Sequence, residues 1–392
     1  MTEPPSRRLK VCHLITMLEF GGAQQNTLYT STHLDPRRFE ASLVTGPGGV
    51  LDDEARRSLP RMIFAASLKR PVRALPDLAA LGELWRILRA ERPDVVHTHS
   101  SKAGILGRLA AFLAGVPVVL HTYHGFGFHD GQPPLLRRAY IAAERVCGAL
   151  SHALIFVSEA NRKTARALGL GDPASHVLIR SGIALSRFPA KVEERGRLKA
   201  SVGAGMHKPL VLSVGNLKPQ KNPEDFVLAA RRVLDEHPEA RFLFLGDGEL
   251  RPRVEGLVIR EKLHGKVLFP GWRRDTPELM AAADVFVLTS LWEGLPRSLV
   301  EAMRTGLPSV CYDTDGVRDL LRDGENGFLA PRGDVGTLAR RVSELLSDEP
   351  LRRRLGEAAA RSVGEEFDID AMVRRQEDLY LRLARERGLL PA

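Results

Sequence analysis

The chain lacks the features that mark disulfide-stapled, secreted or membrane-spanning proteins. Its 392 residues contain only three cysteines, Cys12, Cys147 and Cys311, which are far apart and in no metal-ligand spacing. Such an odd, scattered set argues against a disulfide framework and favours a reducing compartment. The longest apolar stretch, residues 109–120, is too short to span a bilayer and is broken by a glycine and a proline. With no visible signal peptide, the sequence predicts a cytoplasmic protein.

Several binding signatures are absent as well. No G-x-G-x-x-G fingerprint or Walker loop occurs, and we find no helix-turn-helix, zinc-finger or RNP-like motif. The net charge of +9 nevertheless predicts attraction to polyanions, which include nucleic acid, anionic lipid head groups and phosphorylated substrates. Without a nucleic-acid motif, we expect a phosphorylated substrate or a lipid surface and no nucleic-acid partner.

What the chain does have is a regular alternation of short apolar runs with amphipathic segments. A first set of predicted strands covers residues 11–18, 40–46, 62–66, 94–100, 116–124, 152–158 and 177–182. A second set covers residues 209–216, 241–248, 266–271, 284–290 and 308–313. Continuous apolar strands alternating with helices favour parallel sheets covered on both faces. We therefore predict an α/β protein with two doubly wound domains, residues 1–188 and 189–367, and a helix in 368–392 that packs back on the first domain.

Ligands of such sheets bind outside the carboxyl ends of the strands, so the residues there are candidate site residues. Gly21 and Gly22 lie in the turn after the first strand, where a missing Cβ lets a ligand approach the backbone and a helix N-terminus. A plain tight turn is the alternative. Four histidines follow at the ends of the fourth and fifth strands: His97, His99, His121 and His124.

The histidines invite a metal-site interpretation, which we do not adopt. No carboxylate or cysteine completes a ligand set, and alternate strand residues point to opposite faces. His124 stands apart because it directly precedes a glycine at a carboxyl end, where an active-site residue would lie. A histidine held in a turn by hydrogen bonds is the alternative.

The second half carries charged residues at the same kind of position. Lys218 and Lys221 lie in the loop before a helix predicted to begin at Pro223. Two cations beside a helix N-terminus suit a phosphate or diphosphate, although a solvated basic loop explains them equally well.

Two glutamates, Glu293 and Glu301, follow the predicted strand 284–290. Pro296 suits the start of a helix, and Gly306 suits its end. This places Glu293 in the loop and Glu301 on the helix. Carboxylates are strong acceptors, so the pair is a candidate for binding sugar hydroxyls.

These stretches resemble family 4 of the retaining glycosyltransferases, enzymes of the two-domain GT-B fold. The most specific stretch is SLWEGLPRSLVEAMRTGLPSV, which looks like the E-x7-E region of the family. Further blocks follow the family order: VGNLKPQKNP, FLGDGE, FPGWRRD, DGVRDLL and ENGFLAP. The resemblance covers almost the whole chain and implies two Rossmann-like domains facing a central cleft.

The resemblance also assigns roles to residues. It implies that Glu301 binds the donor ribose, that Glu293 contacts the transferred sugar and that Lys221 holds the diphosphate. It matches His124 to an active-site histidine near the donor sugar. The implied catalytic residues are His124, Glu293 and Lys221. The implied donor-binding residues are Gly21, Gly22, Asn216, Lys218, Lys221, Arg273, Gly294, Leu295 and Glu301.

One position departs from the family pattern. Asn216 stands where the family usually has an arginine that pairs with the lysine on the diphosphate. Lys218, Arg273 or Arg274 would have to supply that charge.

The implied reaction is retaining transfer of a hexosyl or N-acetylhexosaminyl group from a nucleotide-diphosphate sugar, with a UDP-sugar expected. No metal or other cofactor is expected. The stretch HTHSSKAGILGR looks like a subgroup associated with bacterial surface polysaccharides, which implies a lipid-linked or growing glycan acceptor. The basic amphipathic stretch 67–93, with Arg137 and Arg138, fits peripheral attachment to the anionic inner face of the cell membrane, although an ordinary surface helix also explains it.

Three other functions stay open on the sequence. A sugar-nucleotide epimerase of the same fold would form product without an acceptor. A non-catalytic nucleotide-sugar-binding protein would keep the fold but lose the charged residues that this chain retains. A nucleic-acid binder would show salt-sensitive binding to any duplex.

Overall fold

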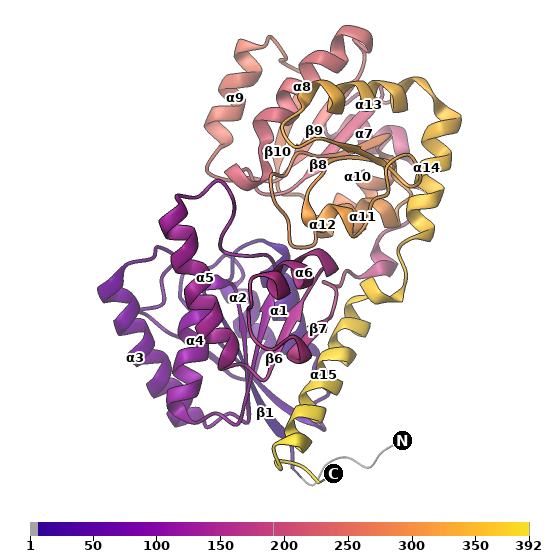
Figure 1. Ribbon diagram of the computed structural model, residues 1–392. Coiled ribbons are helices and arrows are strands. Elements are labelled where there is room, and N and C mark those ends of the chain that lie inside the picture. The colour runs from indigo at the N-terminus through magenta and orange to yellow at the C-terminus, as the bar shows by residue number, and fades with distance from the viewer. Residues whose placement is uncertain (1–6, 191, 392) are drawn as a thin grey trace. The chain divides into compact units, whose positions relative to one another are not determined.

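The computed structural model describes residues 7–190 and 192–391 and divides them into two compact units (Figure 1). The first unit runs to Gly182 and resumes at Ile369, and the second comprises Ile183–Asp368. The division falls earlier in the chain than the predicted boundary after residue 188. The second unit is thus an insertion within the first.

The first unit is built on a seven-stranded sheet of order β3-β2-β1-β4-β5-β6-β7, in which every neighbouring pair is parallel. Its strands are β1 (Leu9–Ile15), β2 (Phe39–Thr45), β3 (Met62–Phe64), β4 (Val95–His99), β5 (Val118–Tyr123), β6 (Ala153–Phe156) and β7 (His176–Leu178). Its helices are α1 (Gly22–His33), α2 (Asp52–Ser58), α3 (Ala74–Glu91), α4 (Ser101–Ala114), α5 (Pro134–Ala149), α6 (Glu159–Ala167) and α15 (Ile369–Glu386).

The second unit has a six-stranded parallel sheet of order β10-β9-β8-β11-β12-β13. Its strands are β8 (Leu210–Val214), β9 (Arg241–Leu245), β10 (Val267–Gly271), β11 (Val285–Leu288), β12 (Ser309–Tyr312) and β13 (Phe328–Ala330). Its helices are α7 (Arg195–Ser201), α8 (Pro223–Glu236), α9 (Arg251–Arg260), α10 (Thr276–Ala282), α11 (Arg297–Arg304), α12 (Asp315–Arg318), α13 (Val335–Ser347) and α14 (Glu349–Arg361). The sequence analysis did not predict β13.

The central strands are buried along their whole length, which is why their sequences are continuously apolar. Helices lie on both sides of each sheet (Figure 1). In the second unit, Phe226 of α8 packs its ring edge-on against Phe244 of β9, with ring centroids 5.5 Å apart. Such layers leave only the sheet edges and the loops at the strand ends open to ligands.

The last helix, α15, belongs to the first unit. Its Tyr380 is fully buried, and the tyrosine hydroxyl lies 2.6 Å from Nδ1 of His97 on β4. Glu377 accepts a hydrogen bond of 2.6 Å from the backbone N–H of Asp35, and Tyr29 of α1 donates one of 2.6 Å to Asp370. Helix α15, at the end of the chain, therefore completes the core of the first unit beside β4. None of the helices in the described part of the chain is long and apolar enough to cross a membrane.

Candidate functional site

Each sheet has one point where the strand order reverses direction. In the second unit it lies between β8 and β11, and in the first between β1 and β4. The loops that leave two such strands run to opposite faces of the sheet and leave a crevice, which is where ligands of doubly wound folds bind. Most of the predicted site residues lie in the loops at these two points.

At the β8–β11 point, Lys221 and Glu293 form an ion pair between their Nζ and Oε1 atoms. Lys221 ends a short 3-10 turn (Pro219–Lys221) after β8, and Glu293 lies in the loop after β11. The two side chains are only 16% and 7% exposed, so little water screens their charges. The structure thus brings together a cation and a carboxylate that are 72 residues apart in the chain.

The two loops are fastened to each other by hydrogen bonds. Thr289 Oγ1 donates to the carbonyl of Lys221 at 2.8 Å, and Gln220 Nε2 donates to the carbonyl of Trp292 at 2.9 Å. The backbone N–H of Leu291 donates to the carbonyl of Gln220 at 2.8 Å. The charged pair is therefore held in position before any ligand arrives. The sequence analysis missed Thr289 and Gln220, because only the pairing of β8 with β11 reveals their role.

Glu301 lies one turn into α11, which begins after Pro296 and ends before Gly306, as predicted. Its Oε1 is 3.8 Å from Nη2 of Arg297, one helical turn earlier. Burial raises the pKa of Glu301 above its ordinary value, although the charges of Arg297, Arg187 and Lys221 act in the opposite direction. Burial also lowers the pKa of Arg297. The sequence analysis missed Arg297, whose only signal was its spacing of four residues from Glu301.

Two of the candidate cations, Lys218 and Arg273, lie in different loops of the second unit. Lys218 starts the 3-10 turn that ends at Lys221, where its N–H donates to Asn216 and its carbonyl accepts from Lys221, both at 2.9 Å. Arg273 instead lies in the loop after the edge strand β10 and is held by Asp275 through two hydrogen bonds, of 2.8 and 2.7 Å. This pairing raises the pKa of Arg273 and commits its guanidinium to its own loop.

Gly294 and Leu295 are buried where α12 packs on the loop after β11. A Cβ at Gly316 of α12 would lie 2.2 Å from the carbonyl oxygen of Gly294. The two backbones are therefore in direct contact. This contact fixes the course of the chain between Glu293 and the start of α11.

At the β1–β4 point of the first unit, Gly21 precedes α1 and Gly22 is its first residue. The backbone of Gly21 is extended, with φ 177°, and a Cβ there would meet only the end of the Gln24 side chain. The fold itself therefore does not require glycine at position 21. Beside this turn, Ser100 Oγ lies 2.8 Å from Thr16 Oγ1, which joins the loops after β1 and β4.

His124 follows β5 and belongs to a row of histidines. Its Nε2 lies 3.1 Å from Nδ1 of His99, and Nε2 of His99 lies 3.1 Å from Nδ1 of His13 on β1. His97, two residues before His99, lies on the same strand face, where its ring nitrogens contact Tyr380 and Thr122. His121 pairs in register with Thr98 and contacts its hydroxyl, on the other face. The expectation that alternate residues would separate these histidines was therefore wrong for His97 and His99.

The cluster also bears on metal binding. Among the residues that the structure describes, His13, His97 and His99 bring ligand nitrogens within 4.8 Å of one another. Neutral imidazoles are zinc ligands, but these three carry no carboxylate or thiolate among them. Hydrogen bonds to Tyr380 at 2.6 Å and Thr122 at 2.7 Å already occupy both nitrogens of His97. A metal ion would have to displace these bonds.

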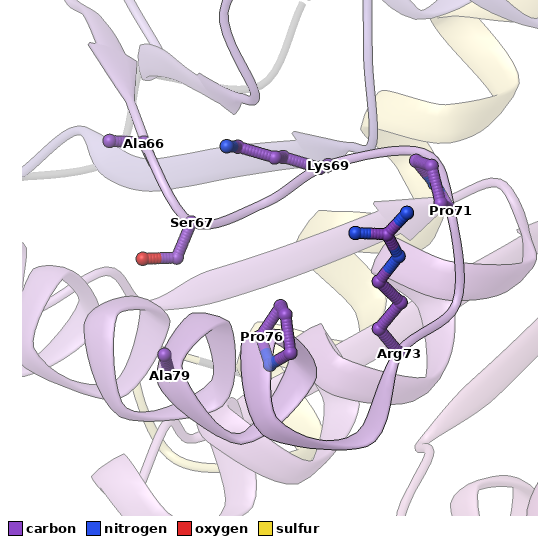
Figure 2. A pocket seen from close by; sticks show the side chains of 7 residues that line it. All are labelled: Ala66, Ser67, Lys69, Pro71, Arg73, Pro76 and Ala79. Atoms are coloured by element: carbon purple, nitrogen blue, oxygen red, sulfur yellow. The ribbon is translucent and has the colours of Figure 1, made fainter.

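A hollow of about 360 Å³ lies after β3, on the carboxyl side of the first sheet (Figure 2). Ser67, Lys69 and Arg73 line it from the loop, and Pro76 and Ala79 line it from α3. Figure 2 shows the Lys69 and Arg73 side chains extending over the same space. Three apolar side chains of the same segment of the chain are exposed: Val72, Leu75 and Leu78.

Comparison with known proteins shows the family to which the chain belongs. The family model described as "Glycosyl transferase 4-like domain" matches residues 21–182, and "Glycosyl transferases group 1" matches residues 194–362. A galactosyltransferase of Escherichia coli, "UDP-Gal:alpha-D-GlcNAc-diphosphoundecaprenol alpha-1,3-galactosyltransferase", is 32% identical over 95% of this chain and 97% of its own. The chain therefore belongs to the glycosyltransferase family that these two models describe. A second relative, "N,N'-diacetylbacillosaminyl-diphospho-undecaprenol alpha-1,3-N-acetylgalactosaminyltransferase" of Campylobacter jejuni, is 28% identical over 76% of this chain and 80% of its own.

Solved structures agree on the fold of this glycosyltransferase. The Anabaena protein HepE in complex with UDP and glucose matches with a TM-score of 0.82 at 21% identity, covering 96% of this chain and all of HepE. A sucrose-phosphate synthase from Thermosynechococcus elongatus matches with a TM-score of 0.82 at 20% identity, covering 97% of this chain and all of the synthase. The predicted GT-B architecture of two Rossmann-like domains is confirmed.

Proposed function

We propose that the chain is a retaining glycosyltransferase that moves a hexosyl or N-acetylhexosaminyl group from a UDP-sugar to a lipid-linked glycan, without a metal. The observation that carries the proposal is the Lys221–Glu293 pair at the β8–β11 reversal point, with Glu301 on the helix that follows. A cation and two carboxylates there match the diphosphate and the hydroxyl groups of a nucleotide sugar.

In this proposal the pair acts by electrostatics. As the sugar–phosphate bond breaks, negative charge builds up on the diphosphate and positive charge on the sugar. Lys221 stabilises the diphosphate, with Lys218 in the same turn and the N-terminus of α8 next to it. Glu293 accepts hydrogen bonds from the transferred sugar, and Glu301 accepts them from the ribose.

The choice of UDP and of a lipid-linked acceptor follows similarity. The Escherichia coli relative uses UDP-Gal, and both relatives named above act on diphosphoundecaprenol-linked sugars by their names. This chain offers a matching surface. Lys69 and Arg73 supply positive charge for a lipid diphosphate or an anionic membrane surface, and Val72, Leu75 and Leu78 supply exposed apolar contacts beside them.

The test is a transfer assay with radiolabelled UDP-hexoses and UDP-N-acetylhexosamines, a short polyprenyl-diphosphate-linked GlcNAc as acceptor, and parallel reactions with EDTA. We expect transfer from one donor, an anomeric configuration equal to that of the donor, and no effect of EDTA. Conversion of the donor without any acceptor would indicate an epimerase. Nucleotide binding without turnover under every condition would indicate a non-catalytic binding protein.

The membrane part of the proposal has its own test. We expect the protein to co-sediment with vesicles that contain an anionic lipid and not with neutral vesicles. Lys69→Glu combined with Arg73→Glu should abolish this co-sedimentation while UDP affinity stays unchanged. Arg353→Glu combined with Arg361→Glu, two exposed residues on α14 of the second unit, is the matched control. Equal co-sedimentation of all three proteins would contradict the membrane contact.

A further inference from the structure

The residue that follows Lys221 has an uncommon backbone conformation. Asn222 joins the 3-10 turn that ends at Lys221 to helix α8, and its φ of 45° and ψ of 57° lie in the left-handed region. Residues with a Cβ rarely adopt this region, although asparagine tolerates it better than most. Such a conformation persists where the surrounding structure holds it. The direction in which the chain leaves Lys221 therefore depends on what holds Asn222.

The side chain of Asn222 is what the first turn of α8 holds. At the start of a helix, asparagine usually has an extended backbone and accepts a hydrogen bond from a backbone N–H of the first turn. Here Nδ2 of Asn222 instead donates to Oδ2 of Asp225 at 2.7 Å. Because an ionised carboxylate only accepts hydrogen bonds, this contact also settles the orientation of the amide. Asp225 thereby ties the left-handed residue to the helix that follows it.

Asp225 is itself fixed from a distant strand. The hydroxyl of Tyr312 on β12 donates to the same Oδ2 atom at 2.7 Å, and the tyrosine is 0% exposed. Burial raises the pKa of Tyr312, and the hydrogen bond to Asp225 acts in the same direction, so the phenol keeps its proton at neutral pH. Strand β11 lies between β12 and β8 in the sheet. The bond therefore connects the far side of β11 with the helix that follows β8.

The backbone of Lys221 is held on the other side of Asn222. Its N–H donates to the carbonyl of Lys218 at 2.9 Å, and its carbonyl accepts from Thr289 at 2.8 Å. The chain before Asn222 is thus fixed to the loop after β11, and the chain after it is fixed through Asp225 to β12. If Asn222 left the left-handed region, the chain could not satisfy both sets of contacts. The ammonium group of Lys221 would then move.

We infer that Asp225 is a positioning residue for Lys221, because it holds Asn222 in the left-handed conformation that sets the path of the chain from the 3-10 turn into α8. A carboxylate has the wrong charge to contact a diphosphate at the start of this helix, which favours a positioning role over a ligand contact. The link from Asp225 to the backbone follows from the geometry. Its effect on donor binding rests on the proposed function.

The first test needs no ligand. Asp225→Asn keeps an oxygen that can accept both hydrogen bonds, whereas Asp225→Ala removes the acceptor. In hydrogen exchange of the full-length protein, we expect the backbone N–H groups of residues 218–225 to exchange at least about 10-fold faster in Asp225→Ala than in the wild type. Asp225→Asn should stay close to the wild type. Unchanged exchange in Asp225→Ala, or equal acceleration in both variants, would overturn the inference.

The second test measures donor binding and includes a rescue. We expect Asp225→Ala to raise the Kd for UDP by about 10-fold, because Lys221 no longer meets the diphosphate in the same place. The Kd for uridine, which has no diphosphate, should stay within about 3-fold. Glycine adopts the left-handed region without a Cβ, so adding Asn222→Gly to Asp225→Ala should restore UDP binding to within about 3-fold of the wild type. Failure of this rescue, or an equal loss for uridine, would contradict the positioning role.

Failure of the inference can be told apart from failure of the proposed function. Faster exchange in Asp225→Ala alone, in a protein that binds no nucleotide, would support the link from Asp225 to the backbone and contradict the donor site. Equal affinity of the wild type and Asp225→Ala for UDP would keep the donor site and contradict the role of Asp225. Thermal unfolding of each variant shows whether it has kept its fold.

Discussion

At the residue scale, Glu293 and Glu301 lie in different electrostatic environments. Glu293 has a direct ionic partner in Lys221, whereas Arg297 lies 3.8 Å from Glu301, beyond hydrogen-bond distance. A ligand hydroxyl at Glu293 must share the carboxylate with an ammonium group. At Glu301, a ligand hydroxyl meets a carboxylate to which Arg297 donates no hydrogen bond. We therefore expect Glu301 to contribute more to binding of the nucleotide and Glu293 more to the geometry of transfer.

Replacing Glu301 by glutamine tests this division. Glu301→Gln keeps the size of the side chain but removes the charge, and hydrogen bonds to a charged group contribute about 1.5–3 kcal/mol. We expect the Kd for UDP to rise by about 10- to 100-fold in isothermal titration calorimetry. Glu357→Gln, an exposed position on α14, is the control and should leave the Kd unchanged. Unchanged UDP affinity in Glu301→Gln would remove Glu301 from the donor site.

The raised pKa of Glu301 makes a second, pH-dependent prediction. The carboxylate accepts hydroxyl protons only when it is ionised, so UDP affinity should fall as the pH drops through the pKa of Glu301. Because burial raises that pKa, the fall should lie above pH 4.5, the ordinary value for glutamate. Kd measured against pH should show this acid-side loss in the wild type. Persistence of the same loss in Glu301→Gln would assign it to another group.

At the scale of elements, Asp284 at the start of β11 ties α7 to the sheet of the second unit. It accepts hydrogen bonds from Arg195 at 2.6 Å, from Lys199 at 2.7 Å and from the N–H of Leu210 at 2.7 Å. Burial would raise the pKa of Asp284, but the two cations outweigh it and lower the pKa. Asp284 therefore has two roles: it aligns β8 with β11, and its ionised carboxylate stabilises the folded second unit.

We expect Asp284→Asn to lower the free energy of unfolding by about 3–5 kcal/mol, because it leaves the buried Lys199 without its counter-charge. Urea denaturation measures this. In the wild type, the contribution is present above the pKa of an unfolded aspartate, about 3.9, and is lost as the pH falls through the lowered native pKa. Asp235→Asn removes an exposed partner of Arg231 and should cost less than about 1 kcal/mol. If the two variants lost the same free energy of unfolding, the buried ion pair of Asp284 would contribute no more than the exposed pair of Asp235.

Much of this architecture was predictable from the sequence, since apolar strands and capped helices leave local patterns. The predicted helix around Glu301 begins after Pro296 and ends before Gly306, because proline and glycine act through their own backbone limits. The Lys221–Glu293 contact was not predictable from pattern alone. It depends on β8 lying beside β11, and strand order is set by packing across the whole sheet. The histidine row escaped notice because His13 lies within the apolar run 11–15 of β1.

At the scale of the whole molecule, the residues proposed to hold the nucleotide and its diphosphate, Lys221 and Glu301, lie in the second unit, and a binding experiment can locate the nucleotide. We expect UDP to slow backbone hydrogen exchange in residues 216–222 and 289–301, because binding suppresses local opening of the segments it contacts. Exchange in α15, which belongs to the first unit, should not change. Mass spectrometry of peptides measures both regions at once. Protection of α15 without protection of the two loops would place the nucleotide elsewhere.

The return of the chain from the second unit to α15 has a consequence for how a ribosome makes this protein. Synthesis runs from the amino end, so the second unit is complete and can fold while the first still lacks its final helix. Until Tyr380 emerges, His97 has no partner at Nδ1, and the apolar residues that α15 covers are open to water. The unit that starts first is therefore the one that finishes last, and a nascent chain stalled before Ile369 would present that open core to chaperones.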